Sequence, residues 1–428
     1  MLHATSGTSS SDSSYHEHAP LAKVTFLRLS VMMLLQFILF GSWFATLGLV
    51  LATYKLPGII GAAYTLSAIA AIVSPVFLGA IGDRYLASQK VLGLAHLVGA
   101  ALMLTLPSLV KAGDANMTLV VIFVYMMCFQ PTLGLSNSIA FRHLGKSDKA
   151  FPFLRVFATV GWVIAGLTVG AMGLSASTGV FTFAAVVSLL LGLYSFTLPA
   201  TPPCAKGAKF SMGDLIGAKS FVLFKDRNFA VLILCAFLTS ISLGVYNTFA
   251  SPYLGVLGIS NVAGVLAIGQ ASEVLFIISV PFVLHKLGLK WALLLGMGMW
   301  GVRFVLFAMA ADGHPSLAVI GVALHGICND FFLILAAMFI DAVAPPELKV
   351  QAQSWLIIAI SGFGSAAGSF ISGTIFGATV AQHPEAGAAA WNYIWLVPIV
   401  SAVITAVIWI AFFRSRTADK PLEPGSVA

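Results

Sequence analysis

Glu273 is a carboxylate in the middle of an otherwise apolar stretch, GQASEVLFIISVP (269–281). The apolar run extends from about 262 to about 285, so Glu273 lies about 11 residues from one end. At ~1.5 Å per helical residue this is about half of a ~30 Å hydrocarbon core. A lone carboxylate there costs at least a few kcal/mol. Gln270 lies three residues earlier, on the same helical face. We therefore expect both side chains to face a protein-lined or watery cavity and to form one polar site.

A second acidic residue, Asp330, occupies a comparable depth in the later run HGICNDFFLILAAMFID. Asn329 is adjacent to it, and His325 lies about a turn and a half earlier. Arg303 falls inside another apolar run, where it is either the counter-ion of Glu273 or Asp330 or part of a purely structural ion pair. A carboxylate that gains a proton from one side of a membrane and releases it to the other is what proton coupling requires.

The first half of the chain carries a polar and aromatic stripe in RVFATVGW (155–162). Arg155, Thr159 and Trp162 are spaced i, i+4 and i+7, so they share one helical face. Tyr246 and Asn247 add polar side chains to a later apolar run. An alternative remains for Arg155, which lies near the end of its run and there can extend its charge toward the aqueous interface.

These residues sit in a chain that must be a polytopic membrane protein. Of its 428 residues 59% are hydrophobic and 9% charged, with a mean hydropathy of +0.99. The continuous apolar runs predict membrane helices rather than a barrel. The fold class predicted is all-α, with twelve transmembrane helices. The runs lie near 27–52, 58–81, 89–110, 117–140, 152–173, 178–199, 229–256, 262–285, 290–311, 316–343, 351–379 and 391–413.

The distribution of basic residues predicts the orientation. All but four of the 22 Lys and Arg lie at the termini or in loops of one parity, the exceptions being Lys55, Lys111, Arg155 and Arg303. By the positive-inside rule both termini are cytoplasmic. We therefore expect a multi-pass protein of the cytoplasmic membrane, whose partner is the lipid bilayer. The net charge of +7 is then a topology signal and does not indicate nucleic-acid binding.

A polar stretch after the sixth run divides the chain into two halves. We expect a disordered cytoplasmic tail (1–24), a first six-helix bundle (25–200), a cytoplasmic central loop (201–228), a second six-helix bundle (229–414) and a cytoplasmic tail (415–428). Two such bundles place a substrate near the bilayer midplane between them.

The sequence offers little for enzyme or metal chemistry. The four cysteines, at 128, 204, 235 and 328, form no disulfide or metal framework. No H-E-x-x-H, Ser-Lys or Cys-His arrangement is present. We expect no catalytic residues, no metal site and no cofactor other than the proton as coupling ion.

Two resemblances refine this expectation. The turn GAIGDR (79–84) resembles the signature loop of the major facilitator superfamily, where it is a conformational latch. The resemblance implies this role for Gly79, Asp83 and Arg84. Within that superfamily the chain resembles the nucleoside:proton symporter family. The stretches that carry this likeness are LLQFILFGSW, QPTLGLSNSI, RVFATVGW, QASEVLFIISVPF, VRFVLFA and NDFF.

The family resemblance implies a nucleoside site at matching positions. It assigns substrate binding to Arg155, Thr159, Trp162, Asn247, Gln270, Glu273, Asn329 and Asp330, and proton coupling to Glu273 and Asp330. Trp162 stands where a Phe is expected, Gly244 where a Gln is expected, and His325 and Asn329 where the family has aromatic residues.

The expected function is uptake of purine or pyrimidine nucleosides with protons by a monomer. A sugar or organic-anion symporter of the same fold is the alternative, because polar residues at the midplane do not by themselves identify the solute.

Overall fold

The computed structural model describes residues 23–84, 86–144, 151–202, 218–345 and 348–414, without the side chains of 75–84, 152, 218, 219 and 350. Throughout these residues the regular structure is helical. Ten helical stretches of the described chain are long and apolar enough to cross a membrane. All twelve predicted apolar runs overlap helices, so the prediction of an all-α membrane protein is confirmed.

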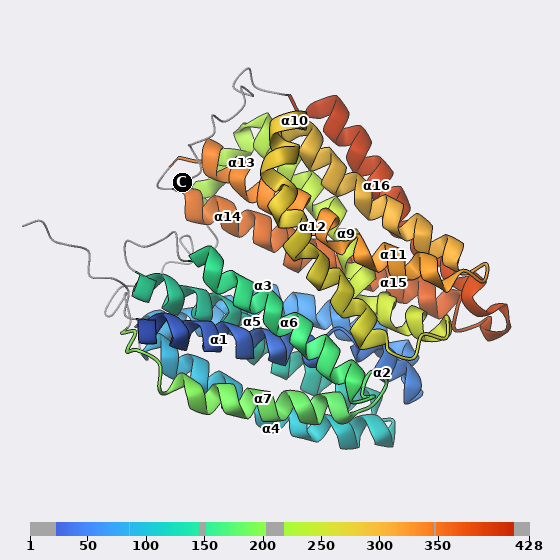
Figure 1. Cartoon of the computed structure of the whole chain (residues 1–428), viewed down its shortest axis with the longest axis horizontal. Helices are drawn as coiled ribbons and strands as arrows, with labels where there is room; N and C mark the ends of the chain where they lie inside the picture. The colour runs from blue at the N-terminus through green and yellow to red at the C-terminus, as the bar shows by residue number, and fades with distance from the viewer. Residues whose placement is uncertain (1–22, 85, 145–150, 203–217, 346–347, 415–428) are drawn as a thin grey trace, which may run out of the picture.

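The first half forms one group of helices, coloured blue to green in Figure 1. Helix α1 packs against α6 and α7, α4 packs against α5 and α7, and α3 packs against α5. The elements are α1 (Lys23–Trp43), α2 (Leu47–Thr53), η1 (Pro57–Ile59), α3 (Ile60–Arg84), α4 (Ser88–Ala112), α5 (Ala115–Leu144), α6 (Phe151–Ala171) and α7 (Gly179–Ser195).

The second half forms the other group, coloured yellow-green to red in Figure 1. In it α9 and α10 pack against α16, and α9 also packs against α15. The elements are η3 (Ala218–Lys225), α9 (Arg227–Val256), α10 (Val262–Ala310), α11 (Pro315–Ala323), α12 (His325–Asn329), η4 (Asp330–Ile334), α13 (Leu335–Val343), α14 (Lys349–Ile357), η6 (Ile358–Gly364), α15 (Ser365–Ala378), η7 (Pro384–Trp391) and α16 (Asn392–Phe412).

Two predicted runs differ in detail from the structure. The runs 262–285 and 290–311 are joined as α10, which bends at Gly288 (φ 70°, ψ 166°), a conformation that glycine adopts readily because it lacks a Cβ atom. The run 316–343 is divided into α11, α12, the π-helix η4 and α13. Short π-helices in membrane spans are frequent at functional sites, and η4 begins at Asp330.

The predicted boundaries of several segments can be compared only in part with the residues that the structure describes. Helix α1 begins at Lys23 and α9 at Arg227, each two residues earlier than expected. The predicted central loop contains the 3-10 helix η3, while residues 203–217 and both tails beyond 23–414 lie outside the described residues. The latch residues Gly79, Asp83 and Arg84 belong to the last turns of α3, and their side chains lie outside the described part of the chain.

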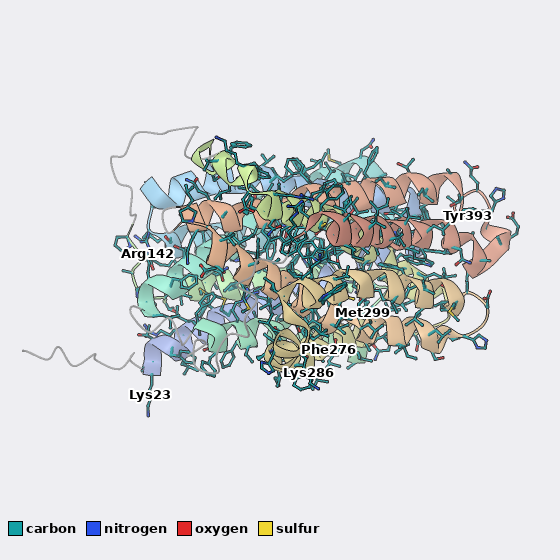
Figure 2. The ribbon with its side chains drawn as sticks, turned by 90° about the horizontal axis from the view of Figure 1, so that it is seen from above. Lys23, Arg142, Phe276, Lys286, Met299 and Tyr393 are labelled. Carbon is teal, nitrogen blue, oxygen red and sulfur yellow. The ribbon has the colours of Figure 1, made fainter. Side chains whose placement is uncertain are left out.

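The two halves touch near one end of the molecule. Contacts join α2 with α9, α3 with α15, and α6 with α10, and in Figure 1 the halves converge around α2 and α15 and diverge toward the other end. Figure 2 shows Lys23 and Arg142 at the diverging end and Tyr393 at the opposite end. Gly61 and Gly373 bring the backbones of α3 and α15 together, because a Cβ on Gly61 would lie 2.6 Å from the Cα of Gly373. We call the end of the molecule at which the two halves touch the converging end.

Candidate functional site

A cavity of about 720 Å³ lies between the two halves. Helices α1, α3, α5 and α6 line it from the first half, and α9, α10, α12, η4, η6 and α15 from the second. The size falls in the usual range for small-molecule sites, ~300–1,000 Å³. All eight residues predicted to bind substrate contribute to its wall: Arg155, Thr159, Trp162, Asn247, Gln270, Glu273, Asn329 and Asp330.

The first half supplies an aromatic wall that the sequence analysis missed. Phe37 and Phe40 of α1, and Phe44 directly after its end, line the cavity together with Trp162 and Tyr64. The rings of Phe40 and Trp162 meet edge to face at 5.0 Å between centroids, which fixes the indole at the cavity surface. The spacing of the three phenylalanines, i, i+3 and i+7, is a helical face and was the signal available in the sequence.

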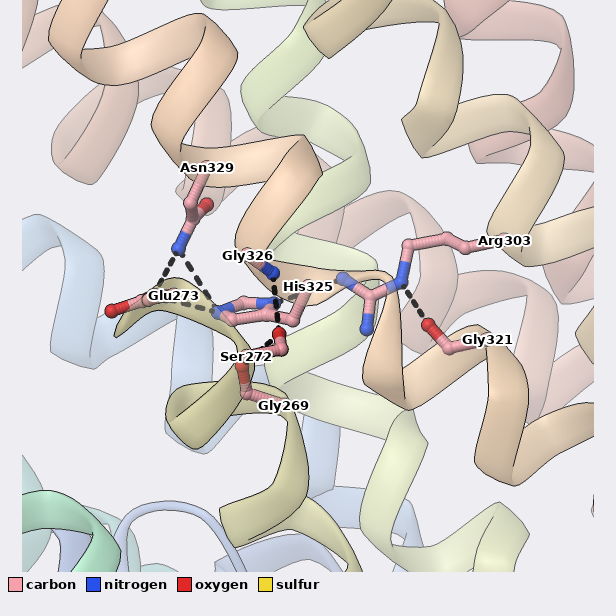
Figure 3. Close-up of polar contacts among 8 residues, drawn as sticks. All are labelled: Gly269, Ser272, Glu273, Arg303, Gly321, His325, Gly326 and Asn329. Atoms are coloured by element: carbon pink, nitrogen blue, oxygen red, sulfur yellow. Dashed lines mark hydrogen bonds and ion pairs between the residues drawn. The ribbon is translucent and has the colours of Figure 1, made fainter. Parts of the chain in front are cut away.

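Glu273 is held in a cluster of polar side chains from the second half (Figure 3). Its Oε1 atom accepts a hydrogen bond of 2.9 Å from Nδ2 of Asn329 and lies 3.5 Å from Nε2 of His325. The same Nδ2 atom is 2.9 Å from Nε2 of His325. His325 and Asn329 lie four residues apart, so α12 presents them on one face toward α10. His325 also lines the cavity, although it was not among the predicted binding residues.

A close contact between α10 and α12 sets this geometry. The hydroxyl of Ser272 donates to the carbonyl of Gly269 at 2.6 Å and accepts from the amide of Gly326 at 2.9 Å. A side chain on Gly326 has no room, since a Cβ would lie 2.6 Å from the carbonyl carbon of Ser272. This contact brings the residue after Ser272, Glu273, beside the first turn of α12.

Arg303 lies behind His325 and is fully buried (0% exposed). Its Nε atom donates to the carbonyl of Gly321 at 3.0 Å, and its Nη1 atom is 3.0 Å from Nδ1 of His325. The guanidinium also lies 3.9 Å from the ring centre of Tyr246, a distance typical of a cation–π contact. Among the described residues it forms no ion pair with Glu273 or Asp330. Both ion-pair interpretations of Arg303 are therefore wrong, because His325 lies between it and the carboxylate.

The remaining charged residues of the cavity differ in their surroundings. Arg155 is exposed to the cavity, lies 5.5 Å from the ring centre of Phe37 and interacts electrostatically with Glu273. Asp330 is 6% exposed, and its Oδ2 atom has no hydrogen-bond partner in the described part of the chain.

A second buried polar cluster lies in the first half, outside the cavity. Gln36 donates to Thr132 at 2.8 Å, and its Oε1 atom is 2.9 Å from Nε2 of His96. All three residues are buried and none belongs to the cavity wall. This cluster joins α1, α4 and α5, and its contacts are structural.

Comparisons with known proteins find related sequences and a related fold. The model of the nucleoside H+ symporter family matches residues 23–418. The chain is 34% identical to a putative nucleoside transporter, YegT, of Escherichia coli strain K12, covering 91% of this chain and 94% of that protein. It is 32% identical to the xanthosine permease of the same strain, covering 91% and 96%. A crystal structure of a variant of the nucleoside transporter NupG is 28% identical with a TM-score of 0.81, covering 91% of this chain and 100% of that one.

Proposed function

We propose a transport mechanism for this chain from one premise, that the chain belongs to the nucleoside H+ symporter family. It is a transporter and not an enzyme, and it couples nucleoside uptake to protons. The observation that carries the mechanism is the convergence of all eight predicted binding residues on one cavity between the halves.

In the proposed complex the base stacks against Trp162 and the aromatic wall of α1, because a flat π-system gains most from such a surface. Thr159, Asn247 and Gln270 form hydrogen bonds to the ribose hydroxyls and base edge. Asn329 and the charged groups of Arg155, Glu273 and Asp330 complete the site. Purine and pyrimidine nucleosides both offer these features.

Protons couple through Glu273 and Asp330 in this mechanism. Both carboxylates line the cavity between the halves. The halves touch at the converging end and diverge toward the other end (Figure 1). Alternation between two such states exposes the carboxylates to each side of the membrane in turn. Moving one charge across 100 mV is worth about 2.3 kcal/mol, enough to drive a neutral solute uphill.

The proposed arrangement in the membrane places twelve spans in two six-helix bundles, 25–200 and 229–414, with both termini in the cytoplasm. The positive-inside pattern supports it, and the bent α10 then provides two spans. The converging end is the outer face of the cytoplasmic membrane, and Gly79, Asp83 and Arg84 are a latch at the inner face. The protein acts as a monomer and needs no cofactor besides the proton.

Equilibrium binding of radiolabelled uridine and adenosine to the purified protein tests the substrate site. Gln270→Leu removes hydrogen bonds from the cavity wall, and we expect it to weaken binding about tenfold, the equivalent of about 1.4 kcal/mol. Gln382→Leu is the matched control, since Gln382 is exposed outside the cavity. Equal affinities for wild type and a combined Gln270→Leu and Thr159→Val protein would refute this site.

A further inference from the structure

Five serine, threonine, asparagine or glutamine side chains of the cavity wall have no hydrogen-bond partner in the described part of the chain. Three of them are among the predicted binding residues, and the other two are Gln130 of α5 and Ser361 of η6. The other residues of these four types in the wall are hydrogen-bonded within the protein: Ser67, Ser365, Ser369 and Asn329. Gln130 and Ser361 therefore offer hydrogen bonds to a ligand in the same way as Thr159, Asn247 and Gln270.

The cavity wall is a ring of helices in which the two halves meet twice. Each helix of the ring contacts the next, in the order α6, α1, α5, α3, η6, α9 and α10, and α10 contacts α6 again. The halves meet where α6 contacts α10 and where α3 contacts η6. Because other helices of the ring separate these two contacts in both directions, they lie on opposite sides of the cavity.

The eight predicted binding residues leave the α3–η6 side of the cavity without a polar contact. Five of them lie on α6 and α10, and Asn329 and Asp330 belong to α12 and η4, which pack against α10. Asn247 belongs to α9. Gln130, on α5 beside α3, and Ser361, on η6, supply polar groups on the other side.

The packing of α5 turns Gln130 toward the cavity. Gln130 and Thr132 are two residues apart, so their side chains point about 200° apart around the helix. Thr132 is held on the side of the buried cluster, because it accepts a hydrogen bond of 2.8 Å from Gln36 of α1. The amide of Gln130 is thus directed away from that cluster and toward the cavity, whose wall it joins.

A π-helix presents Ser361 to the cavity. In η6 the hydroxyl of Ser365 donates to the carbonyl of Ile360, five residues earlier, at 2.9 Å. Ser361 lies in this wider turn, is exposed and lines the cavity. Short π-helices are frequent at functional sites, and the other π-helix of the second half, η4, contributes Asp330 to the same cavity.

We propose that Gln130 and Ser361 bind the ribose of the nucleoside, across the cavity from the charged residues. The inference rests on the proposed function and deepens it. An amide group and a hydroxyl can each donate and accept hydrogen bonds, which matches ribose hydroxyls, since these also do both. The base then lies toward α6, where Trp162 stacks on it. Because the ribose is common to purine and pyrimidine nucleosides, this contact holds both classes.

Equilibrium binding of radiolabelled uridine to the purified full-length protein, with competition by unlabelled deoxyuridines, tests this proposal. Gln130→Leu and Ser361→Ala should each weaken uridine binding about 3- to 10-fold, the equivalent of one net hydrogen bond. The 2′-, 3′- and 5′-deoxyuridines each lack one hydroxyl. For the analogue without the hydroxyl that the residue binds, the substitution should leave the affinity unchanged, because that contact is already absent.

Matched controls separate a ribose contact from a general change of the cavity. Ser67 also belongs to the wall, but it is 1% exposed and its hydroxyl donates to the carbonyl of Ala63 at 2.8 Å. Ser67→Ala should therefore bind uridine as wild type does. Gln382→Leu, exposed outside the cavity, is the control for the glutamine substitution. Thermal unfolding without nucleoside should show that all four variants are folded.

The outcomes separate this inference from the proposed function. Wild-type affinity for uridine in either Gln130→Leu or Ser361→Ala overturns the inference. An equal loss of affinity for uridine and for all three deoxyuridines also overturns it, because the lost contact is then not to the ribose. Failure of the wild-type protein to bind any nucleoside would instead overturn the proposed function.

Discussion

Replacing Gly61 by alanine should disrupt the converging end. The added Cβ would lie 2.6 Å from Cα of Gly373 and 3.1 Å from the carbonyl oxygen of Ser369. Both atoms belong to the backbone of α15, so no side-chain rotation relieves the clash. Because carbon atoms in normal contact are about 3.5–4.0 Å apart, α3 must move away from α15 by about 1 Å.

The cost of this overpacking is about 1–3 kcal/mol, and it falls only on the state in which α3 touches α15. The population of that state should therefore drop roughly 5- to 150-fold relative to the state open at this end. Double electron–electron resonance between spin labels at Lys55 and Gln382, both exposed, measures the two populations. We expect a longer distance component to grow in Gly61→Ala.

Gly58→Ala is the matched control, because Gly58 lies three residues earlier and a Cβ there meets nothing within 4 Å. It should give the wild-type distance distribution. If Gly61→Ala gives that same distribution, the reasoning is refuted and the Gly61–Gly373 contact does not control closure.

Three further variants separate binding from stability. Trp162→Ala should weaken uridine binding roughly 5- to 150-fold through the loss of about 1–3 kcal/mol of stacking, and unchanged equilibrium binding would contradict the stacking role. Gln36→Leu should lower the free energy of unfolding by about 1–3 kcal/mol, since His96 loses a buried partner. The affinity for uridine should stay at the wild-type value. Thermal unfolding measures the first effect and a binding assay the second. Asn261→Ala should lower stability by about 0.5–2 kcal/mol, because its side chain accepts from the amide of Gly264 at the start of α10; an unchanged unfolding temperature would argue against that cap.

The polar members of the site were predictable because a polar side chain in a membrane span is expensive. Glu273, Gln270 and Asp330 stand out in the sequence for this reason, and the structure brings them to one cavity. The spacing of Phe37 and Phe40 places them on one helical face, but it does not tell whether that face meets lipid or a cavity, because aromatic residues occur in both places.

The partner of Arg303 was not predictable from spacing. A buried arginine and two buried carboxylates suggest an ion pair, but the bend of the chain through α12 and η4 places His325 between them. A π-helix changes which residues of a span share one face. Its presence depends on tertiary packing, so the periodicity of the sequence does not reveal it.

Gly244 stands where the family resemblance leads us to expect a Gln, and the packing around it gives a physical reason for the difference. A Cβ at this position would lie 3.0 Å from Cα of Ser365, so the first turn of α15 occupies the space that a larger residue would need. The sequence identified the departure, and only the position of α15 explains it.

Gradient-driven accumulation in proteoliposomes tests the central claim most directly. Radiolabelled uridine or adenosine uptake is measured under an imposed inward proton gradient for wild type, Glu273→Gln and Asp330→Asn. We predict that wild type accumulates nucleoside above the external concentration only with the gradient, and that Glu273→Gln abolishes this accumulation. Accumulation by Glu273→Gln equal to that of wild type, or uptake of sugars or organic anions without nucleosides, would contradict the account.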